Sequence, residues 1–333
     1  MNKVGVIAGA LAGALLSACT INLDFGTNVI VPVLPDGGSL DAAMVTDGAG
    51  TRPDSGGGAH DGGSDASGPT DAMAPPGDGA AAAGPVENGI AYHGGKLMTG
   101  ATKIYLIWYG DWSKSLAQGI VVDWASSIGA TPWYAINTTY SDMQGTPVKA
   151  AVSFGGQAYD TGYSRGKSLG DADVALLVEG AISGHKLPKD PDGVYFVLTA
   201  ADVDESSGFC SAYCGYHWYS TVSGTRIKYA FVGNPARCPK VCEPQSVSPN
   251  FDPAADSMAS IMSHELAEAV TDPEGTGWYE GTDQENGDKC ASTWGATQST
   301  SKGALYNMSF GGRSWFIQQN WVNRNGGYCA LSL

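Results

Sequence analysis

Apolar and polar positions divide the chain into three stretches with different patterns. Residues 1–19 contain an apolar run behind a single lysine. Between residues 20 and 86 the chain consists mostly of Gly, Ala, Asp, Ser and Pro, and large apolar residues are almost absent after the short run NVIVPVL. From residue 87 to residue 333, apolar runs alternate with turn-forming residues, so we expect one globular domain there.

Strand-like and helix-like patterns alternate along the globular stretch. Apolar residues at helical spacing, followed by a terminal glycine, predict helices over 113–129 and 171–184. Continuous runs of apolar and β-branched residues predict strands, at 103–110, 148–156, 193–200 and 226–234. The C-terminal region is rich in Gly, Asn and Trp, and we expect loops and short strands there. This order predicts a single domain of the α/β or α+β class with a central mixed sheet.

A further helix is predicted around SMASIMSHELAEAVTDPEG, residues 257–275, with a start near 254–257. Its apolar residues form one stripe, made of Met258, Ile261, Met262, Leu266, Ala269 and Val270. His264, Glu265 and Glu268 lie off this stripe. Two interpretations remain open: a solvent-exposed polar face, or a metal site on a zincin-like active-site helix.

His264 and Glu268 are four residues apart, so they share one helix face and are separated by about 6 Å along the axis. The pair is similar to H-E-x-x-H, in which two side chains grip one zinc ion, with a carboxylate in place of the second imidazole. Glu265 is then placed to act as the general base toward water at the metal. We therefore predict catalytic Glu265 and the zinc ligands His264 and Glu268.

A third metal ligand is expected from the acidic loop TDPEGTGWYEGTDQENGDKC that follows. Asp288 is favoured because Cys290 is expected to anchor its loop. Glu285 in the same loop is one rival. Asp272 is the other, provided that the helix ends before Pro273. A carboxylate-rich set also suits calcium, which prefers oxygen ligands, so calcium is the alternative to zinc.

Six cysteines lie in the globular stretch, an even number that predicts disulfides and an oxidising compartment. The spacings in CSAYC and CPKVC differ from the CxxC of zinc ribbons, which favours bridges over a four-cysteine zinc site. We expect Cys290 to pair with Cys329. The other four are expected to pair among themselves: Cys210, Cys214, Cys238 and Cys242.

The N-terminal run is too short to span a bilayer and ends in Leu16-Ser17-Ala18-Cys19. This is the lipobox pattern, in which the cysteine is lipidated and becomes the mature N-terminus, so we predict a lipoprotein signal peptide over 1–19. Residues 20–86 contain nine Asp and one Arg and are predicted to be a disordered acidic linker. We expect an exported protein anchored through Cys19 to a bacterial membrane or cell surface; Thr20 is compatible with the outer membrane.

The charge of the chain restricts its partners. With 33 acidic and 18 basic residues the net charge is −15, which argues against nucleic-acid binding. The chain carries no P-loop and no dinucleotide-binding fingerprint. We expect a monomer.

Three stretches together resemble the plant EXORDIUM or phosphate-induced family of extracellular proteins, which is implicated in cell expansion and growth signalling at the cell wall. They are YHGGKLMTGATKIYLIWYGDWS (92–113), LTAADVDESSGFCSAYCGYH (198–217) and KYAFVGNPARCPKVC (228–242). The segment HELAEAVTDP…ENGDKC resembles a bacterial and fungal branch of secreted metallopeptidases. His93 and His217 lie within the family-like stretches, and we expect structural roles for both.

Two functions are consistent with these patterns. The first is a lipid-anchored, zinc-dependent peptidase that acts on peptide or a cell-wall polymer. The second is a non-catalytic surface module that binds cell-wall glycan or peptide, with calcium or without a metal.

Overall fold

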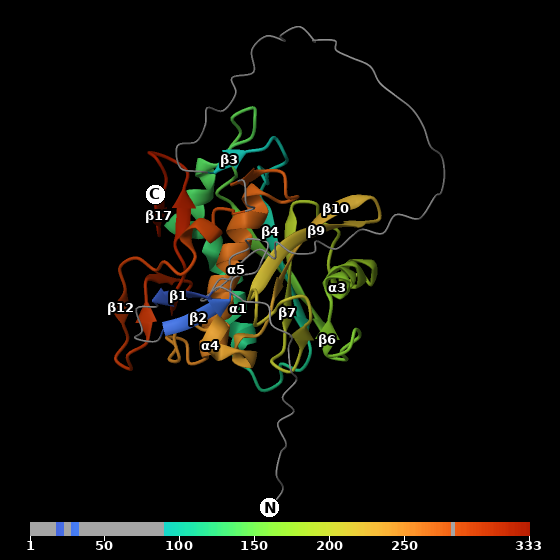
Figure 1. The fold of residues 1–333 in the computed structure, drawn as a ribbon. Helices are drawn as coiled ribbons and strands as arrows, with labels where there is room; N and C mark the ends of the chain where they lie inside the picture. Colours follow the sequence, from blue (N-terminus) through green and yellow to red (C-terminus); the bar gives the residue numbers. More distant parts are fainter. Residues whose placement is uncertain (1–17, 23–27, 33–89, 281–283) are drawn as a thin grey trace, which may run out of the picture.

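The computed structural model describes residues 18–22, 28–32, 90–280 and 284–333 (Figure 1). Most of the predicted signal peptide and linker lies outside these residues, and so does the side chain of Cys19, so both predictions stay predictions. The described part of that stretch is an antiparallel pair, β1 (Ala18–Asn22) and β2 (Asn28–Pro32). Within the described ranges, no helix is both long and apolar enough to cross a membrane.

A five-stranded mixed sheet forms the centre of the domain, as predicted. Its strands lie in the order β5 (Val152–Asp160), β4 (Thr102–Tyr109), β7 (Gly193–Thr199), β10 (Thr225–Val232) and β9 (Gly215–Val222). The first four are parallel, and β9, at the edge, is antiparallel to β10. All of β7 is buried, as expected for a central parallel strand that is covered on both faces.

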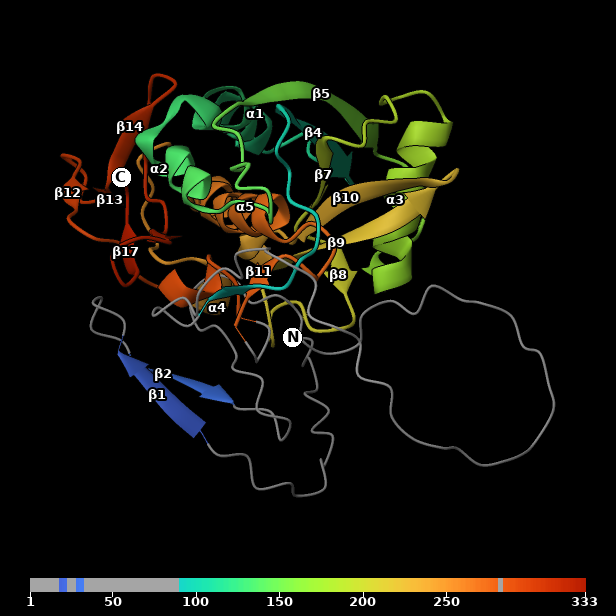
Figure 2. The ribbon, with the colours of Figure 1, turned by 90° about the horizontal axis from the view of Figure 1, so that it is seen from above.

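Helices cover both faces of this sheet (Figures 1 and 2). One face is covered by α3 (Asp171–Ser183), and the other by α1 (Ala117–Ser127) and α5 (Pro253–Thr271). The indole Nε1 of Trp124 on α1 donates a hydrogen bond to Oγ of Ser263 on α5 at 3.0 Å, with both groups buried. This contact fixes α1 against α5, the helix that carries the HExxE segment.

Short elements complete the domain, and the C-terminal strand pairs lie on the side of α5 away from α3 (Figures 1 and 2). The short helices and 3₁₀ turns are α2 (Pro132–Ala135), α4 (Pro239–Cys242), η1 (Ile128–Ala130), η2 (Ile136–Thr139), η3 (Pro235–Arg237) and η4 (Asp288–Cys290). The strand pairs are β3 (Ala91–Tyr92) with β11 (Trp278–Tyr279), β6 (Ser168–Leu169) with β8 (Asp204–Glu205), β12 (Gln298–Ser299) with β13 (Leu305–Tyr306), β14 (Met308–Phe310) with β15 (Arg313–Trp315), and β16 (Asn320–Val322) with β17 (Tyr328–Ala330).

The structure differs from the predicted elements at two places. The strand expected at 148–156 is β5, which starts and ends four residues later. Strand β9 was not predicted at all. It is joined to β10 by Ser223 and Gly224, whose φ angles of 46° and 75° form a tight two-residue hairpin connection.

Candidate metal centre

Local sequence determines where α5 begins and ends. The carboxylate of Asp252 accepts a hydrogen bond from the backbone N–H of Ala255 at 3.1 Å, and Pro253 occupies the first turn, where its missing N–H costs nothing. The helix ends at Thr271, and Asp272 precedes Pro273, which disfavours helical geometry in the residue before it.

The polar side chains of α5 do not form a solvent-exposed face. His264 is 1% exposed, and Glu265 and Glu268 are both fully buried. Burying an imidazole and two carboxylates is costly unless charge and hydrogen-bonding partners compensate them. The interpretation of these residues as a solvent-exposed polar face is therefore wrong.

The predicted ligand set meets at one point. Nε2 of His264 lies 2.9 Å from Oε1 of Glu268 and 3.4 Å from Oδ1 of Asp288. The backbone N–H of Asp288 also donates to Oε1 of Glu268 at 3.0 Å. One donor atom from each of the three side chains lies within 4.8 Å of the other two, a spacing that suits a single metal ion.

A second group of side chains adjoins the first. Nε2 of His217 lies 2.8 Å from Oε2 of Glu285 and 4.0 Å from Oε2 of Glu268. These three side chains also bring donor atoms within 4.8 Å of one another. The sequence analysis predicts a structural role for His217 and names Glu285 as a rival third ligand. The structure instead brings both to the far oxygen of Glu268.

Two other candidate residues lie in different settings. Oδ1 of Asp272 accepts hydrogen bonds from the backbone N–H groups of Thr276 and Gly277 at 2.6 and 2.7 Å, so this carboxylate organises the turn after α5. The exposed ring of His93 stacks on Tyr279 with 3.7 Å between ring centroids. Neither residue belongs to the two clusters of possible ligands.

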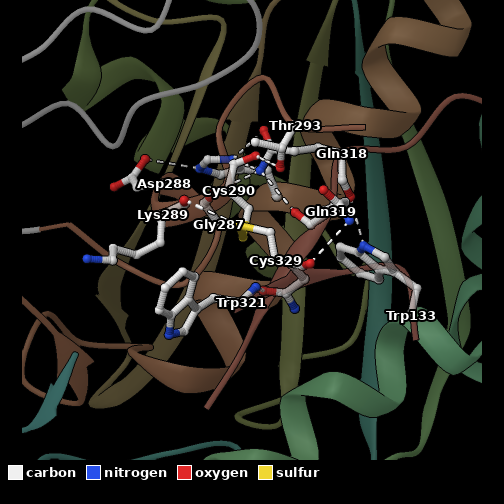
Figure 3. The surroundings of a disulfide bond; sticks show 12 residues. Trp133, Gly287, Asp288, Lys289, Cys290, Thr293, Gln318, Gln319, Trp321 and Cys329 are labelled. Atoms are coloured by element: carbon white, nitrogen blue, oxygen red, sulfur yellow. Dashed lines mark hydrogen bonds and ion pairs between the residues drawn. A yellow bond between two sulfur atoms is a disulfide. The ribbon is translucent and has the colours of Figure 1, made fainter. Parts of the chain in front are cut away.

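The loop that carries Asp288 packs tightly over α5. A Cβ added to Gly287 would lie 2.7 Å from Oε1 of Glu268 and 2.9 Å from Cγ of His264, so only glycine fits there without displacement. Asp288 starts the η4 turn, and that turn ends at Cys290, which is bonded to Cys329 (Figure 3). The disulfide thus ties the turn that starts at Asp288 to β17.

Strand β9 approaches α5 equally closely from the other side. A Cβ on Gly215 would lie 2.8 Å from Cγ2 of Ile261 and 3.0 Å from Oε1 of Glu265. His217 is two residues further along β9, and alternate residues of a strand point to the same face. Gly215 and His217 therefore both face α5.

A glutamine amide contacts the other nitrogen of His264. Nε2 of Gln318 donates to the carbonyl oxygen of Gly287 at 2.8 Å (Figure 3). The same Nε2 lies 3.1 Å from Nδ1 of His264, and Oε1 of Gln318 lies 3.4 Å from that nitrogen. If Nε2 bound a metal, the ring proton would lie on Nδ1, where Oε1 of Gln318 could accept it. The sequence analysis did not identify Gln318 as a neighbour of the His264 ring.

The field at His264 favours positive charge. Burial lowers the pKa of His264, but the carboxylates of Glu268, Asp288 and Glu265 more than offset it and hold that pKa well above its usual range. Among the described residues, Nε2 of this ring makes no hydrogen bond of normal geometry, although two carboxylate oxygens are close. The same field would attract a cation to this point.

All six cysteines of the domain form disulfides: Cys210–Cys238, Cys214–Cys242 and Cys290–Cys329. The pairing of Cys290 with Cys329 and of the other four among themselves is confirmed. A four-cysteine zinc site is excluded because no thiolate remains in that set. The disulfides indicate an exported protein.

Comparison with known proteins connects this arrangement to one family. The model of the phosphate-induced protein 1 conserved region matches residues 90–321. Protein EXORDIUM-like 3 of Arabidopsis thaliana is 32% identical over 271 residues, which cover 70% of this chain and 80% of that protein. Protein PHOSPHATE-INDUCED 1 of Nicotiana tabacum is 31% identical over 220 residues, 58% of this chain and 67% of that protein. No solved structure matches the chain.

Proposed function

This chain belongs to the phosphate-induced protein 1 family, and we propose that it is an exported zinc-dependent peptidase. The observation that carries the proposal is the convergence of His264, Glu268 and Asp288, whose donor atoms lie within 4.8 Å of one another in the interior. Three protein ligands are the usual number at a catalytic zinc.

The donor types favour zinc over calcium. Zinc accepts imidazole nitrogen and carboxylate oxygen together, whereas calcium takes oxygen ligands alone. His264 would supply the nitrogen, and Glu268 and Asp288 the oxygens. Calcium stays the alternative because two of the three donors are carboxylates.

Glu265 is the proposed general base. It follows His264 directly and is fully buried between α5 and β9, where its charge acts on the His264 ring. A divalent cation held here would lower the pKa of water to about 7 and so supply a nucleophile at neutral pH. Glu265 would accept the proton of that water and pass it to the leaving amine.

The burial of the ligand set favours a second candidate function. The side chains of His264 and Glu268 are 0% exposed and that of Asp288 is 10% exposed. Structural metal sites are closed in this way, whereas catalytic ones keep an open position. The alternative is a non-catalytic surface module, stabilised by a cation, that binds cell-wall glycan or peptide.

Metal analysis combined with Glu265→Gln separates these candidates. The purified full-length chain is assayed for bound zinc and for cleavage of casein and a fluorogenic peptide library. We expect Glu265→Gln to keep its zinc and lose about 10²–10⁴-fold in cleavage rate. The matched control is Glu179→Gln, an exposed carboxamide change on α3, which should alter neither.

Each other outcome has a defined meaning. A zinc-loaded wild type without cleavage, together with retained binding to cell-wall polymer, would favour the surface module. A chain that binds no zinc and cleaves nothing would remove the peptidase proposal.

We also propose that the chain is anchored through lipid on Cys19, from the lipobox pattern at the predicted signal peptide. Cys19→Ser should release the protein from the membrane fraction, and mass spectrometry of the wild-type N-terminal peptide should reveal acyl chains. An unmodified Cys19 in membrane-bound protein would contradict this proposal.

A further inference from the structure

Glu268 contributes its two carboxylate oxygens to two different groups of side chains. Oε1 faces Nε2 of His264 at 2.9 Å, and Oε2 faces Nε2 of His217 at 4.0 Å. Asp288 completes the first group and Glu285 the second. We infer that the domain holds two divalent cations, one in each group, bridged by the carboxylate of Glu268. This inference rests on the proposed metal centre and extends it.

The second group has the composition of a metal site. His217 supplies an imidazole, and Glu268 and Glu285 supply carboxylates, so each group offers one nitrogen and two oxygen donors. The three residues come from β9, α5 and the loop before η4, and β9 is distant in sequence from the other two. His217 and Glu285 are both 6% exposed, so the group lies in the interior beside the first.

The charges of the six side chains match two divalent cations. When ionised, Glu265, Glu268, Glu285 and Asp288 carry four negative charges, and the two imidazoles must be neutral to bind metal. One divalent cation would balance half of this charge, and two would balance all of it.

The shared carboxylate sets the expected geometry. Two cations bridged in this way are typically about 3.5–4 Å apart, close enough to act on one substrate group together. The direct contact of 2.8 Å between His217 and Glu285 would then open to admit the second ion between the two side chains. His217 is thereby assigned as a metal ligand and not as a structural residue of β9.

Metal stoichiometry tests the inference directly. The purified full-length chain is stripped with chelator, reloaded with zinc, dialysed and analysed by mass spectrometry of the metal. We expect two zinc ions per chain in the wild type and one in His217→Ala. The control His185→Asn removes an exposed imidazole at a φ of 55°, which asparagine tolerates, and should keep two.

A second measurement does not depend on the variant folding. Wild-type protein loaded with two equivalents of manganese should give the spin-coupled resonance of a close ion pair. One zinc in the wild type, or two that survive His217→Ala, would overturn the inference and leave the proposed peptidase standing. Absence of bound metal from the wild type would overturn both.

Discussion

The backbone of Gly287 packs directly on the side chain of Glu268. A Cβ at position 287 would lie 2.7 Å from Oε1 of Glu268, closer than real contacts allow. Because the same Cβ would also touch the ring of His264, one added methyl group would press on two proposed ligands together. Glycine at this position is therefore required by close approach, since its φ of −70° is ordinary.

We expect Gly287→Ala to weaken zinc binding. Displacing the loop moves Asp288 away from its partners, and disturbing the support of metal ligands typically costs about 10–100-fold in affinity. The overpacking should also lower the free energy of unfolding by about 1–3 kcal/mol. Competition with a chromophoric chelator measures the first effect and urea denaturation the second.

Gly180→Ala is the matched control, because nothing lies within 4 Å of the added Cβ on the exposed side of α3. It should leave zinc affinity unchanged and raise the unfolding free energy by about 0.5–1 kcal/mol. Equal zinc affinities for the two variants would show that the loop does not position the ligands.

Gln318→Leu should also weaken zinc binding, by about 10–100-fold, because it removes the amide that orients the His264 ring. Gln318→Glu should lose less, since its carboxylate still accepts the Nδ1 proton that metal binding requires. Isothermal titration with zinc compares the affinities of the wild type, Gln318→Leu and Gln318→Glu. The neighbouring Gln319, whose Nε2 donates to the carbonyl of Cys329 at 3.2 Å, provides the control Gln319→Leu. An equal loss in both leucine variants would contradict a specific role for Gln318.

Much of the fold follows from local patterns. The apolar runs of β4, β7 and β10 and the amphipathic α3 are strong signals, and their predicted bounds agree with the structure to within two residues. The predicted helix over 113–129 is shorter in the structure, Ala117–Ser127. Residues 113–116 are irregular in the structure, and no pattern in the sequence excluded them from the predicted helix.

The edge strand β9 had a signal that we did not use. Its residues Gly215–Val222 include several aromatic and β-branched side chains, and the following Ser-Gly pair is a known hairpin connection. Recognising that hairpin would have placed His217 on a strand antiparallel to β10. Its meeting with Glu285, 68 residues later, depends on tertiary packing and could not be predicted from spacing.

In the candidate site, too, some features follow from local sequence and others depend on tertiary packing. The pair His264 and Glu268 follows from helical periodicity, which fixes the relation of residues four apart. The choice among Asp272, Glu285 and Asp288 required the path of the chain after α5. That path depends on the turn that Asp272 organises and on the disulfide between Cys290 and Cys329. The turn depends on backbone conformation and the disulfide on a long-range contact, and spacing along the sequence predicts neither.

Glu205 gives a test of buried charge away from the metal centre. Burial raises the pKa of Glu205, and hydrogen bonds from Tyr213 and Ser207 only partly oppose it. A carboxyl group whose pKa is higher in the folded state stabilises the fold below its unfolded pKa, near 4.5. That stability is lost as the pH rises through the folded pKa.

The unfolding free energy of wild type relative to Glu205→Gln should therefore fall as the pH rises from about 4 to 7, by about 1.4 kcal/mol for each unit by which the pKa is raised. Urea denaturation of both proteins at several pH values measures this difference. Glutamine does not titrate, so a difference that stays constant or grows with pH would contradict the raised pKa.

Loss of the disulfide between Cys290 and Cys329 should lower zinc affinity as well as the stability of the fold. Replacing both cysteines by serine frees the η4 turn that holds Asp288, and we expect zinc affinity to fall at least about tenfold. The control replaces Cys210 and Cys238. The bridges span 39 and 28 residues, so loop-closure entropy predicts a similar stability loss of about 4 kcal/mol for each.

Zinc titration and thermal unfolding are compared under conditions in which both variants stay folded by circular dichroism. Because the entropic losses are matched, any excess loss of zinc affinity in the Cys290/Cys329 variant reports on the position of Asp288. Equal zinc affinities in the two variants would mean that Asp288 is held by contacts other than this disulfide.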